Sequence, residues 1–262
     1  MPIRLPADFP SAEKLNQEGV FTHTYERAFS QEIRPLKIAL LNLMPTKIDT
    51  EVQLLRLLSL SSIQIEPLFL KTSSHQTKYG AEHLDKFYVD FPSISNQRFD
   101  AIIITGAPLE QLDFEQVDYW DELVEVVHWA NDNVFAELFI CWGAQAGLYI
   151  DFGIQKTMLE QKLFGVFDYT TSGQHRLTRG FDDVIRIPQS RFSELNHSDL
   201  AKVIASGKLI PLLTDTHGTP NIITTPHTHK TYLLGHLEYD RETLDIEYRR
   251  DLAHAKNSQY SV

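Results

Sequence analysis

The sequence predicts an α/β fold in which helices cover both faces of a mostly parallel sheet. Short, almost wholly apolar runs at 36–43 and 101–105 are typical of strands that are buried on both faces. Helical segments alternate with these runs, and right-handed crossovers make such neighbouring strands parallel. Ligands of parallel sheets bind at the carboxyl ends of the strands. The residues that directly follow each run are therefore the first place to look for a site.

The N-terminal half of the chain supplies most of this pattern. Residues 1–34 follow neither the helical nor the strand period, and we expect them to form an arm packed on the core. After the first strand, Thr50 and Gln53 have the spacing of a capping box, which marks the start of a helix. Further strands are expected at 63–70, 101–105 and 138–140, and a helix at 119–129.

The apolar runs become shorter beyond residue 160. We expect strands at 184–187 and 232–234, and a last helix from 242 to about 255. The sequence shows neither a linker nor an internal repeat after the arm. Residues 35–262 are therefore expected to form a single α/β domain, because a chain of this length can bury one large core.

Composition limits the class of partner. The 262 residues include 35 Asp and Glu against 24 Lys and Arg, a formal net charge of −11, which repels nucleic-acid backbones and anionic lipid surfaces. The sequence shows no leader pattern and no apolar run near the ~20 residues that span a bilayer. We therefore expect a cytoplasmic protein that acts on small molecules.

Cys141 is the only cysteine of the chain, so an internal disulfide is excluded. It lies where the strand at 138–140 breaks into the small-residue turn at 142–147. A lone cysteine is more often a small buried apolar residue. A sharp strand-to-helix turn, however, lifts one side chain clear of the backbone and directs nearby amide groups towards it. The turn therefore favours Cys141 as a nucleophile.

A thiol nucleophile needs a base, and the base needs a group that orients it. His236 and Glu238 can supply both functions. They are two residues apart in an extended segment, so their side chains project from one face, and the carboxylate can fix the tautomer of the imidazole. The sequence therefore predicts a catalytic set of Cys141, His236 and Glu238.

Several ordered motifs extend this pattern. They are Asn-Leu-Met-Pro at 42–45 with a Leu-rich helix after it, Thr-Gly-Ala-Pro at 105–108, Cys-Trp-Gly-Ala-Gln at 141–145, Leu-Phe-Gly-Val-Phe at 163–167, Thr-Arg-Gly-Phe-Asp-Asp at 178–183, Ser-Arg at 190–191 and Gly-His-Leu-Glu-Tyr-Asp at 235–240. From about residue 1 to 255 the chain resembles the homoserine O-acyltransferase family. That family has succinyl- and acetyl-transferring branches, and the resemblance implies a class I glutamine amidotransferase-like, flavodoxin-like fold.

The resemblance implies a ping-pong reaction with coenzyme A thioesters. Cys141 would carry the acyl group, His236 would deprotonate the substrate hydroxyl and Glu238 would orient His236. The amide of Trp142 would stabilise the oxyanions, with a second donor from the loop after the first strand. Acetyl-CoA is then a co-substrate, and no permanently bound cofactor is expected.

The resemblance also implies the residues that bind the substrates. Lys162, Ser190 and Arg250 occupy the family's substrate-binding positions. Arg191 and Glu247 would complete the pocket, since a guanidinium can pair with both oxygens of a carboxylate and Glu247 can accept from an ammonium group.

Glu110 bears on the choice of acyl group. The acetyl-transferring branch has glutamate at this position and the succinyl-transferring branch has glycine. A carboxylate there fills the acyl pocket and repels the free carboxylate of a succinyl group. The resemblance therefore implies acetyl transfer, with succinyl transfer as an alternative.

Two departures from the family pattern affect the acceptor. Leu237 stands where typical members have proline, and this chain stops at Val262 whereas typical members continue for several tens of residues. The acceptor side of the site, or a homodimer contact, is expected to differ. L-Homoserine, for methionine biosynthesis, is the expected acceptor. L-Serine, for cysteine biosynthesis, is the alternative, because one methylene is discriminated by only ~1–3 kcal/mol.

Three rival hypotheses stay open. A glutaminase has a similar Cys-x-Gly-x-Gln turn, but normally has a small residue where this chain has Phe139. A metal hydrolase would use His217, His227 and His229, although no acidic residue stands at a fixed spacing from them, and no metal is expected. A binding module would use the same core without the thiol.

Overall fold

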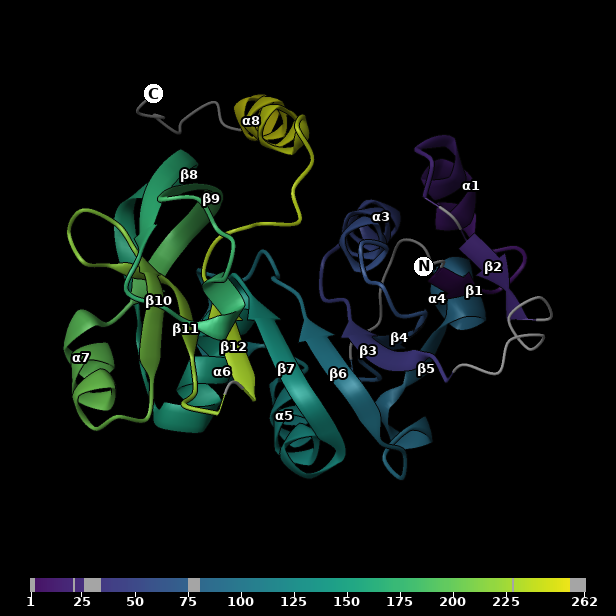
Figure 1. Ribbon diagram of the computed structural model, residues 1–262, viewed down its shortest axis with the longest axis horizontal. Coiled ribbons are helices and arrows are strands. Elements are labelled where there is room, and N and C mark those ends of the chain that lie inside the picture. The colour runs from purple at the N-terminus through teal and green to yellow at the C-terminus, as the bar shows by residue number, and fades with distance from the viewer. Residues whose placement is uncertain (1–2, 21, 26–33, 75–80, 228, 255–262) are drawn as a thin grey trace. The chain divides into compact units, whose positions relative to one another are not determined.

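The computed structural model of the protein describes residues 3–20, 22–25, 34–74, 81–227 and 229–254. The chain divides into two compact units, which Figure 1 shows as a ribbon. One unit holds the chain up to residue 107 together with 114–137, and the other holds 108–113 and 138–262. Strand β7, Val134–Ile140, carries the chain from the first unit into the second. The single domain predicted for 35–262 stays a prediction.

The first unit is built on a parallel sheet with the strand order β2-β1-β4-β3-β6, and β5 pairs with β4. Its elements are β1 (Ile3–Leu5), α1 (Pro10–Gln17), β2 (Thr22–Thr24), β3 (Leu36–Leu41), α3 (Lys47–Leu58), β4 (Ile65–Lys71), α4 (Ala81–Phe87), β5 (Tyr88–Asp90), β6 (Phe99–Ile104) and α5 (Trp120–Asn133). Because β4 lies beside β3 and β7 beside the far edge of β6, right-handed crossovers put α3 and α5 on opposite faces (Figure 1).

The predicted strands of this unit are found, because their side chains are buried on both faces. Leu40, Ile102 and Ile104 have no exposed surface, as the apolar runs require. The described part of the arm contributes β1, α1 and β2, and β1 pairs with β4 at Ile3 and Ile65. Helix α4 and strand β5 carry no clear period and were not predicted.

The start of helix α3 corrects the prediction of a capping box. The helix begins at Lys47 with Thr46 as its N-cap, so Thr50 lies inside it. The Thr50 hydroxyl donates to the backbone oxygen of Thr46 at 3.0 Å, and Gln53 is buried in the helix. The Thr-x-x-Gln spacing here is part of a buried helical face, which is why it misplaced the helix start.

The second unit continues with the strand order β7-β12-β11-β10-β8-β9, and its strands from β8 to β12 pair antiparallel. Its elements are α6 (Trp142–Phe152), β8 (Lys156–Thr171), β9 (Val184–Leu195), α7 (His197–Ala205), β10 (Ile210–Thr214), β11 (Pro220–Thr224), β12 (Lys230–Leu233) and α8 (Thr243–His254). The α/β class is confirmed, but strands after residue 160 are not short, since β8 has 16 residues. Position 255, the expected end of the last helix, lies outside the described residues.

Helix α6 is held on its neighbouring strands by a buried ion pair. Lys230 Nζ on β12 donates to both carboxylate oxygens of Asp151 on α6, at 2.7 and 2.8 Å. The Tyr232 hydroxyl donates to the same carboxylate. Tyr232 also stacks on Phe139 of β7, with ring centroids 5.0 Å apart. Because Gly147 has no side chain, α6 can approach the Phe139 ring closely.

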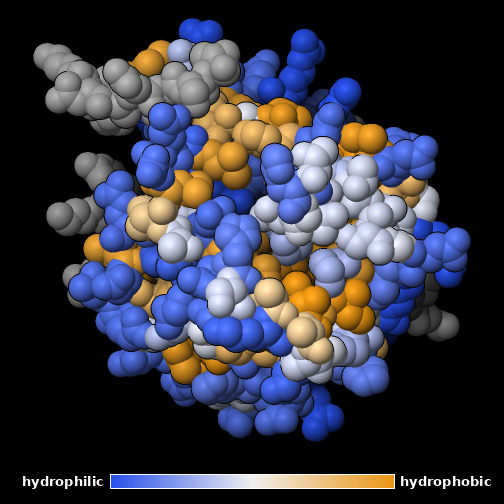
Figure 2. Space-filling view, turned by 90° about the vertical axis from the view of Figure 1, so that its left-hand side faces the viewer, coloured by the Kyte–Doolittle hydropathy of each residue, from blue (hydrophilic) through white to orange (hydrophobic). Residues whose placement is uncertain are grey.

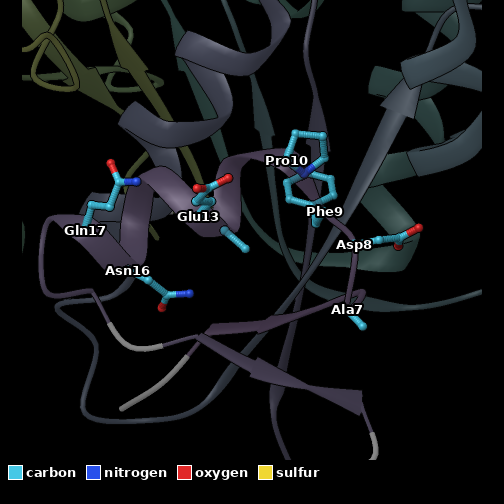
Figure 3. Close-up of a pocket in the computed structure, with 8 residues that line it drawn as sticks. Ala7, Asp8, Phe9, Pro10, Glu13, Asn16 and Gln17 are labelled. Atoms are coloured by element: carbon cyan, nitrogen blue, oxygen red, sulfur yellow. The ribbon is translucent and has the colours of Figure 1, made fainter.

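Figure 2 turns the left-hand side of Figure 1, where β8, β10 and α7 are labelled, towards the viewer. Apolar side chains on this face lie in several groups separated by polar ones. Figure 3 shows a hollow in the first unit along α1, lined by residues of the segment from Ala7 to Gln17. None of the predicted site residues lines this hollow. No helix among the described residues combines the length and apolar character that a membrane crossing requires.

We expect Lys230→Met to lower the free energy of unfolding by ~3–5 kcal/mol, because it leaves the buried Asp151 carboxylate without its cation. Tyr232→Phe is the matched control, since it removes one hydrogen bond to the same carboxylate and should cost only ~1–3 kcal/mol. Both values are measured by denaturant unfolding. A smaller loss for Lys230→Met than for Tyr232→Phe would contradict this role of the ion pair.

Candidate active site

Cys141 occupies a strained turn between β7 and α6. Its backbone has φ 52° and ψ −115°, and it is the one non-glycine residue with positive φ in the described part of the chain. Such a conformation costs ~1–3 kcal/mol and persists only where its surroundings impose it. The Cys141 amide donates to the Leu233 oxygen at 2.7 Å, and its own oxygen accepts from the amides of Ala144 and Gln145 at 3.0 and 3.1 Å. These bonds fix the predicted strand-to-helix turn.

The thiol therefore lies at the start of α6. The N-terminus of a helix carries a partial positive charge. Trp142 is the first residue of the helix, where backbone amides point out of the helix end. This placement is the one that the predicted oxyanion contact of the Trp142 amide requires.

His236 and Glu238 form a buried pair beside the thiol. His236 Nδ1 and Glu238 Oε1 are 2.6 Å apart, and the two side chains are only 5% and 9% exposed. Because Glu238 engages Nδ1, Nε2 is the ring nitrogen left for Cys141, whose charge raises the pKa of the imidazole. The structure thus brings together all three residues of the predicted catalytic set.

The charges around His236 decide its protonation state. Burial lowers the pKa of His236, but the charges of Glu238 and Cys141 and its hydrogen bonds to both outweigh burial and raise that pKa well above its ordinary value of 6.5. The imidazolium is therefore the favoured form beside Cys141 at neutral pH. A thiolate paired with an imidazolium is the reactive state of a cysteine nucleophile.

Tyr239 joins the base to helix α8 and was not predicted. Its ring stacks on the imidazole of His236 with centroids 4.1 Å apart and an angle of 19°. Its hydroxyl donates to Glu247 Oε1 at 2.8 Å. The other oxygen of Glu247 is buried and accepts no hydrogen bond from the described residues. The predicted Glu247 is thus connected to the base and keeps one oxygen available for a cation.

Lys162 and Arg250 meet at a carboxylate that sequence reasoning missed. Lys162 Nζ, buried on β8, donates to Asp251 Oδ2 at 2.7 Å. The half-exposed Arg250 donates to Asp251 Oδ1 from Nε and Nη2 at 3.0 and 2.9 Å. The only signal in the sequence for Asp251 was its position next to the predicted Arg250. An Asp beside an Arg is too common in helices to identify a site residue.

Glu110 shares this environment. Burial raises the pKa of Glu110, and the charges of Lys162, Lys156 and His236 oppose that rise. Lys156 Nζ also donates to the backbone oxygen of Glu110 at 2.7 Å. Glu110 therefore lies within electrostatic reach of both the predicted substrate lysine and the base.

Ser190 and Arg191 lie next to each other on β9. Ser190 is half-buried and pairs in register with Phe164 of β8. Arg191 is buried and donates from Nε to Gln189 Oε1 at 3.2 Å and from Nη1 to the backbone oxygen of Ser193. These contacts belong to a buried polar network that the sequence did not reveal. Across the described residues, no group of three or more His, Cys, Asp or Glu side chains is arranged to hold a metal ion.

Comparison with known proteins shows a strong similarity along the whole chain. The family model described as homoserine O-succinyltransferase matches residues 2–262. A protein named homoserine O-acetyltransferase from Geobacillus kaustophilus is 48% identical over 255 residues, which cover 97% of this chain and 83% of that protein. The homoserine O-acetyltransferase of Bacillus subtilis is 46% identical over 254 residues, covering 96% of this chain and 83% of that protein.

Solved structures share the fold at low identity. A glutamine amidotransferase from Thermotoga maritima has a TM-score of 0.58 and 11% identity, covering 86% of this chain and 87% of that one. A glutamine amidotransferase from Methylobacillus flagellatus has a TM-score of 0.55 and 10% identity, covering 87% and 81%. These likenesses show the fold alone, and they confirm the predicted fold class.

Replacing Glu238 by Gln removes the charge that opposes burial most strongly at His236, so the pKa of His236 should fall. The imidazolium is present below that pKa and is lost as the pH rises through it. In the variant, the pair of Cys141 thiolate and His236 imidazolium should therefore be lost near neutral pH. We expect alkylation of Cys141 by iodoacetamide to slow about tenfold there, the effect of one pKa unit.

Alkylation by iodoacetamide reports on Cys141 alone, because the chain has one cysteine. Leu237→Ala is the matched control, since the Leu237 side chain is exposed and carries no charge. An alkylation rate of Glu238→Gln equal to that of the wild type would contradict the pairing.

Proposed function

This chain belongs to the homoserine O-succinyltransferase family, and we propose that it is an O-acetyltransferase that moves an acetyl group from acetyl-CoA, through a thioester on Cys141, to the side-chain hydroxyl of L-homoserine. The observation that carries this proposal is the position of Cys141 at a strained helix start beside the hydrogen-bonded pair of His236 and Glu238. The acetyl-transferring relatives described above support the acyl group and the acceptor.

The first half-reaction uses the ion pair of the resting site. The Cys141 thiolate attacks the carbonyl carbon of acetyl-CoA, and the oxyanion that forms would accept from the Trp142 amide. As the carbon–sulfur bond to coenzyme A breaks, the proton of the His236 imidazolium passes to the departing thiolate. The products are acetylated Cys141, free coenzyme A and a neutral imidazole.

Acetylation itself prepares the base for the second half-reaction. When Cys141 becomes a thioester it loses the charge that had raised the pKa of His236. That pKa therefore falls in the acyl-enzyme, where burial still lowers it. Neutral His236 can then take the proton of the acceptor hydroxyl, whose oxygen attacks the thioester. Cys141 leaves again as a thiolate, which restores the starting charges.

Helix α8 carries a negatively charged and a positively charged side chain that can bind the two charged groups of an amino acid. The unpartnered Glu247 oxygen is suited to the substrate ammonium group, because a carboxylate accepts hydrogen bonds from several donors. Arg250 is held by Asp251 yet remains about half exposed, so its guanidinium can also engage the substrate carboxylate. Lys162 and Ser190 complete the proposed substrate contacts from β8 and β9.

Acetyl-CoA is the proposed co-substrate, and no permanently bound cofactor enters the mechanism. Every residue of the mechanism comes from one chain, so a homodimer is not required for it. The homodimer and the cytoplasmic location stay predictions. L-Serine, succinyl transfer and glutamine hydrolysis are the alternatives that the following experiments separate.

Competition between L-homoserine and L-serine for acetylated enzyme tests the acceptor. We expect homoserine to win by about tenfold or more, the discrimination that one methylene supplies. The measurement is the ratio of the two O-acetylated amino acids formed from an equimolar mixture. A preference for serine would show that serine, and not homoserine, is the acceptor. Ammonia release from glutamine without use of acetyl-CoA would show that the protein is a glutaminase and not an acetyltransferase.

Glu110→Gly tests the acyl pocket. The change removes a buried carboxylate and opens space, so succinyl-CoA should gain in kcat/KM relative to acetyl-CoA by about tenfold or more, the effect of ~1.4 kcal/mol. Glu110→Gln is the matched control, because it keeps the volume and removes the charge. If Glu110→Gly leaves the ratio of the two kcat/KM values unchanged, Glu110 does not select the acyl group.

A further inference from the structure

Arg191 is a buried charge whose hydrogen-bond partners are both neutral. It is 4% exposed, and it donates to the side-chain oxygen of Gln189 and the backbone oxygen of Ser193. A buried guanidinium usually faces a carboxylate, because a charge left unpaired in the interior is costly. The question is therefore which negative charge balances Arg191.

The hydrogen bonds lead from Arg191 to the turn of the nucleophile. The Ser193 oxygen that accepts from Arg191 also accepts from Gln145 Nε2 at 3.1 Å. The Ser193 hydroxyl donates back to Gln145 Oε1 at 2.7 Å. Gln145 lies in the first turn of α6, and its amide donates to the Cys141 oxygen at 3.1 Å. One backbone carbonyl thus joins the guanidinium to the helix start that holds the thiol.

The same strand also supports the base. The His236 amide donates to the Pro188 oxygen at 3.0 Å. A side chain at Gly235 would come within 2.5 Å of the Gln189 amide nitrogen, so the backbone before His236 lies directly on Gln189. Gln189 in turn accepts from Arg191. Arg191 is therefore built into the scaffold between the segments that carry nucleophile and base.

Electrostatics agrees with this placement. Burial lowers the pKa of Arg191, and the charges of Cys141, Tyr169 and Glu194 oppose burial, with Cys141 the largest of the three. Even with a lowered pKa, an arginine stays protonated at neutral pH. His236 gives up its proton during the proposed cycle, but Arg191 keeps its charge throughout.

We propose that Arg191 is the permanent buried counter-ion of the Cys141 thiolate, and that it acts as a positioning residue beneath the nucleophile. This role deepens the proposed function and rests on its cysteine nucleophile. When the acceptor displaces Cys141 from the thioester, the electron pair of the broken carbon–sulfur bond stays on sulfur, and Arg191 stabilises that leaving group.

The test is a pH titration of the Cys141 thiolate, followed by its ultraviolet absorbance, in the wild type, Arg191→Met and Arg191→Lys without substrates. We expect Arg191→Met to raise the midpoint by about one pH unit, a tenfold loss of thiolate at neutral pH. Arg191→Lys keeps the charge and should shift the midpoint less. An unchanged midpoint in Arg191→Met would overturn the proposal, and a raised KM for the amino acid, measured separately by steady-state kinetics, would then assign Arg191 to a substrate contact.

Gln189→Glu decides the matter if Arg191→Met does not fold. This nearly isosteric change gives the guanidinium a carboxylate partner at 3.2 Å, the present distance from Arg191 Nε to Gln189 Oε1. The thiolate should then lose part of its counter-ion, and the midpoint should rise. A midpoint equal to that of the wild type would overturn the proposal. The titration uses neither acetyl-CoA nor acceptor, so its outcome is separate from that of the acetyl-transfer assays.

Discussion

The strained backbone of Cys141 is the constraint on which the rest of the site depends. A positive φ at a non-glycine residue needs surrounding structure to impose it, and here β12 and the first turn of α6 do so through backbone hydrogen bonds. The far end of α6 is fixed by the buried pair of Asp151 and Lys230. Sheet and helix together therefore hold the thiol at the helix start.

The chemistry follows from how charges are distributed around that thiol. One removable proton lies on His236, which Glu238 orients, and one permanent charge lies on Arg191. In the proposed cycle, acetylation neutralises sulfur and so lowers the pKa of the base. Helix α8 carries the residues proposed to bind the acceptor, and Tyr239 connects one of them, Glu247, to the imidazole by stacking on the ring and donating to Glu247.

The local sequence pattern was sufficient to predict much of the fold and of the candidate site. The apolar runs placed β3, β4 and β6, and the Cys-Trp-Gly turn and the His-x-Glu spacing placed the three central residues. The pattern failed where long-range pairing decides the structure. The β8–β9 hairpin depends on register between distant residues, such as Leu163 with Arg191, and Asp251 gains its role only because α8 lies against Lys162. The Thr50–Gln53 spacing misled because burial, rather than capping, selects those residues.

The formation of a covalent acyl-enzyme tests the central claim most directly. The protein is mixed with acetyl-CoA alone, quenched rapidly with acid and weighed intact by mass spectrometry, and peptide mapping then locates the added group. The account predicts one acetyl group, on Cys141, which disappears when homoserine is added before the quench. An enzyme that forms O-acetylhomoserine while no acetyl adduct is found, or while the adduct lies on another residue, would contradict it.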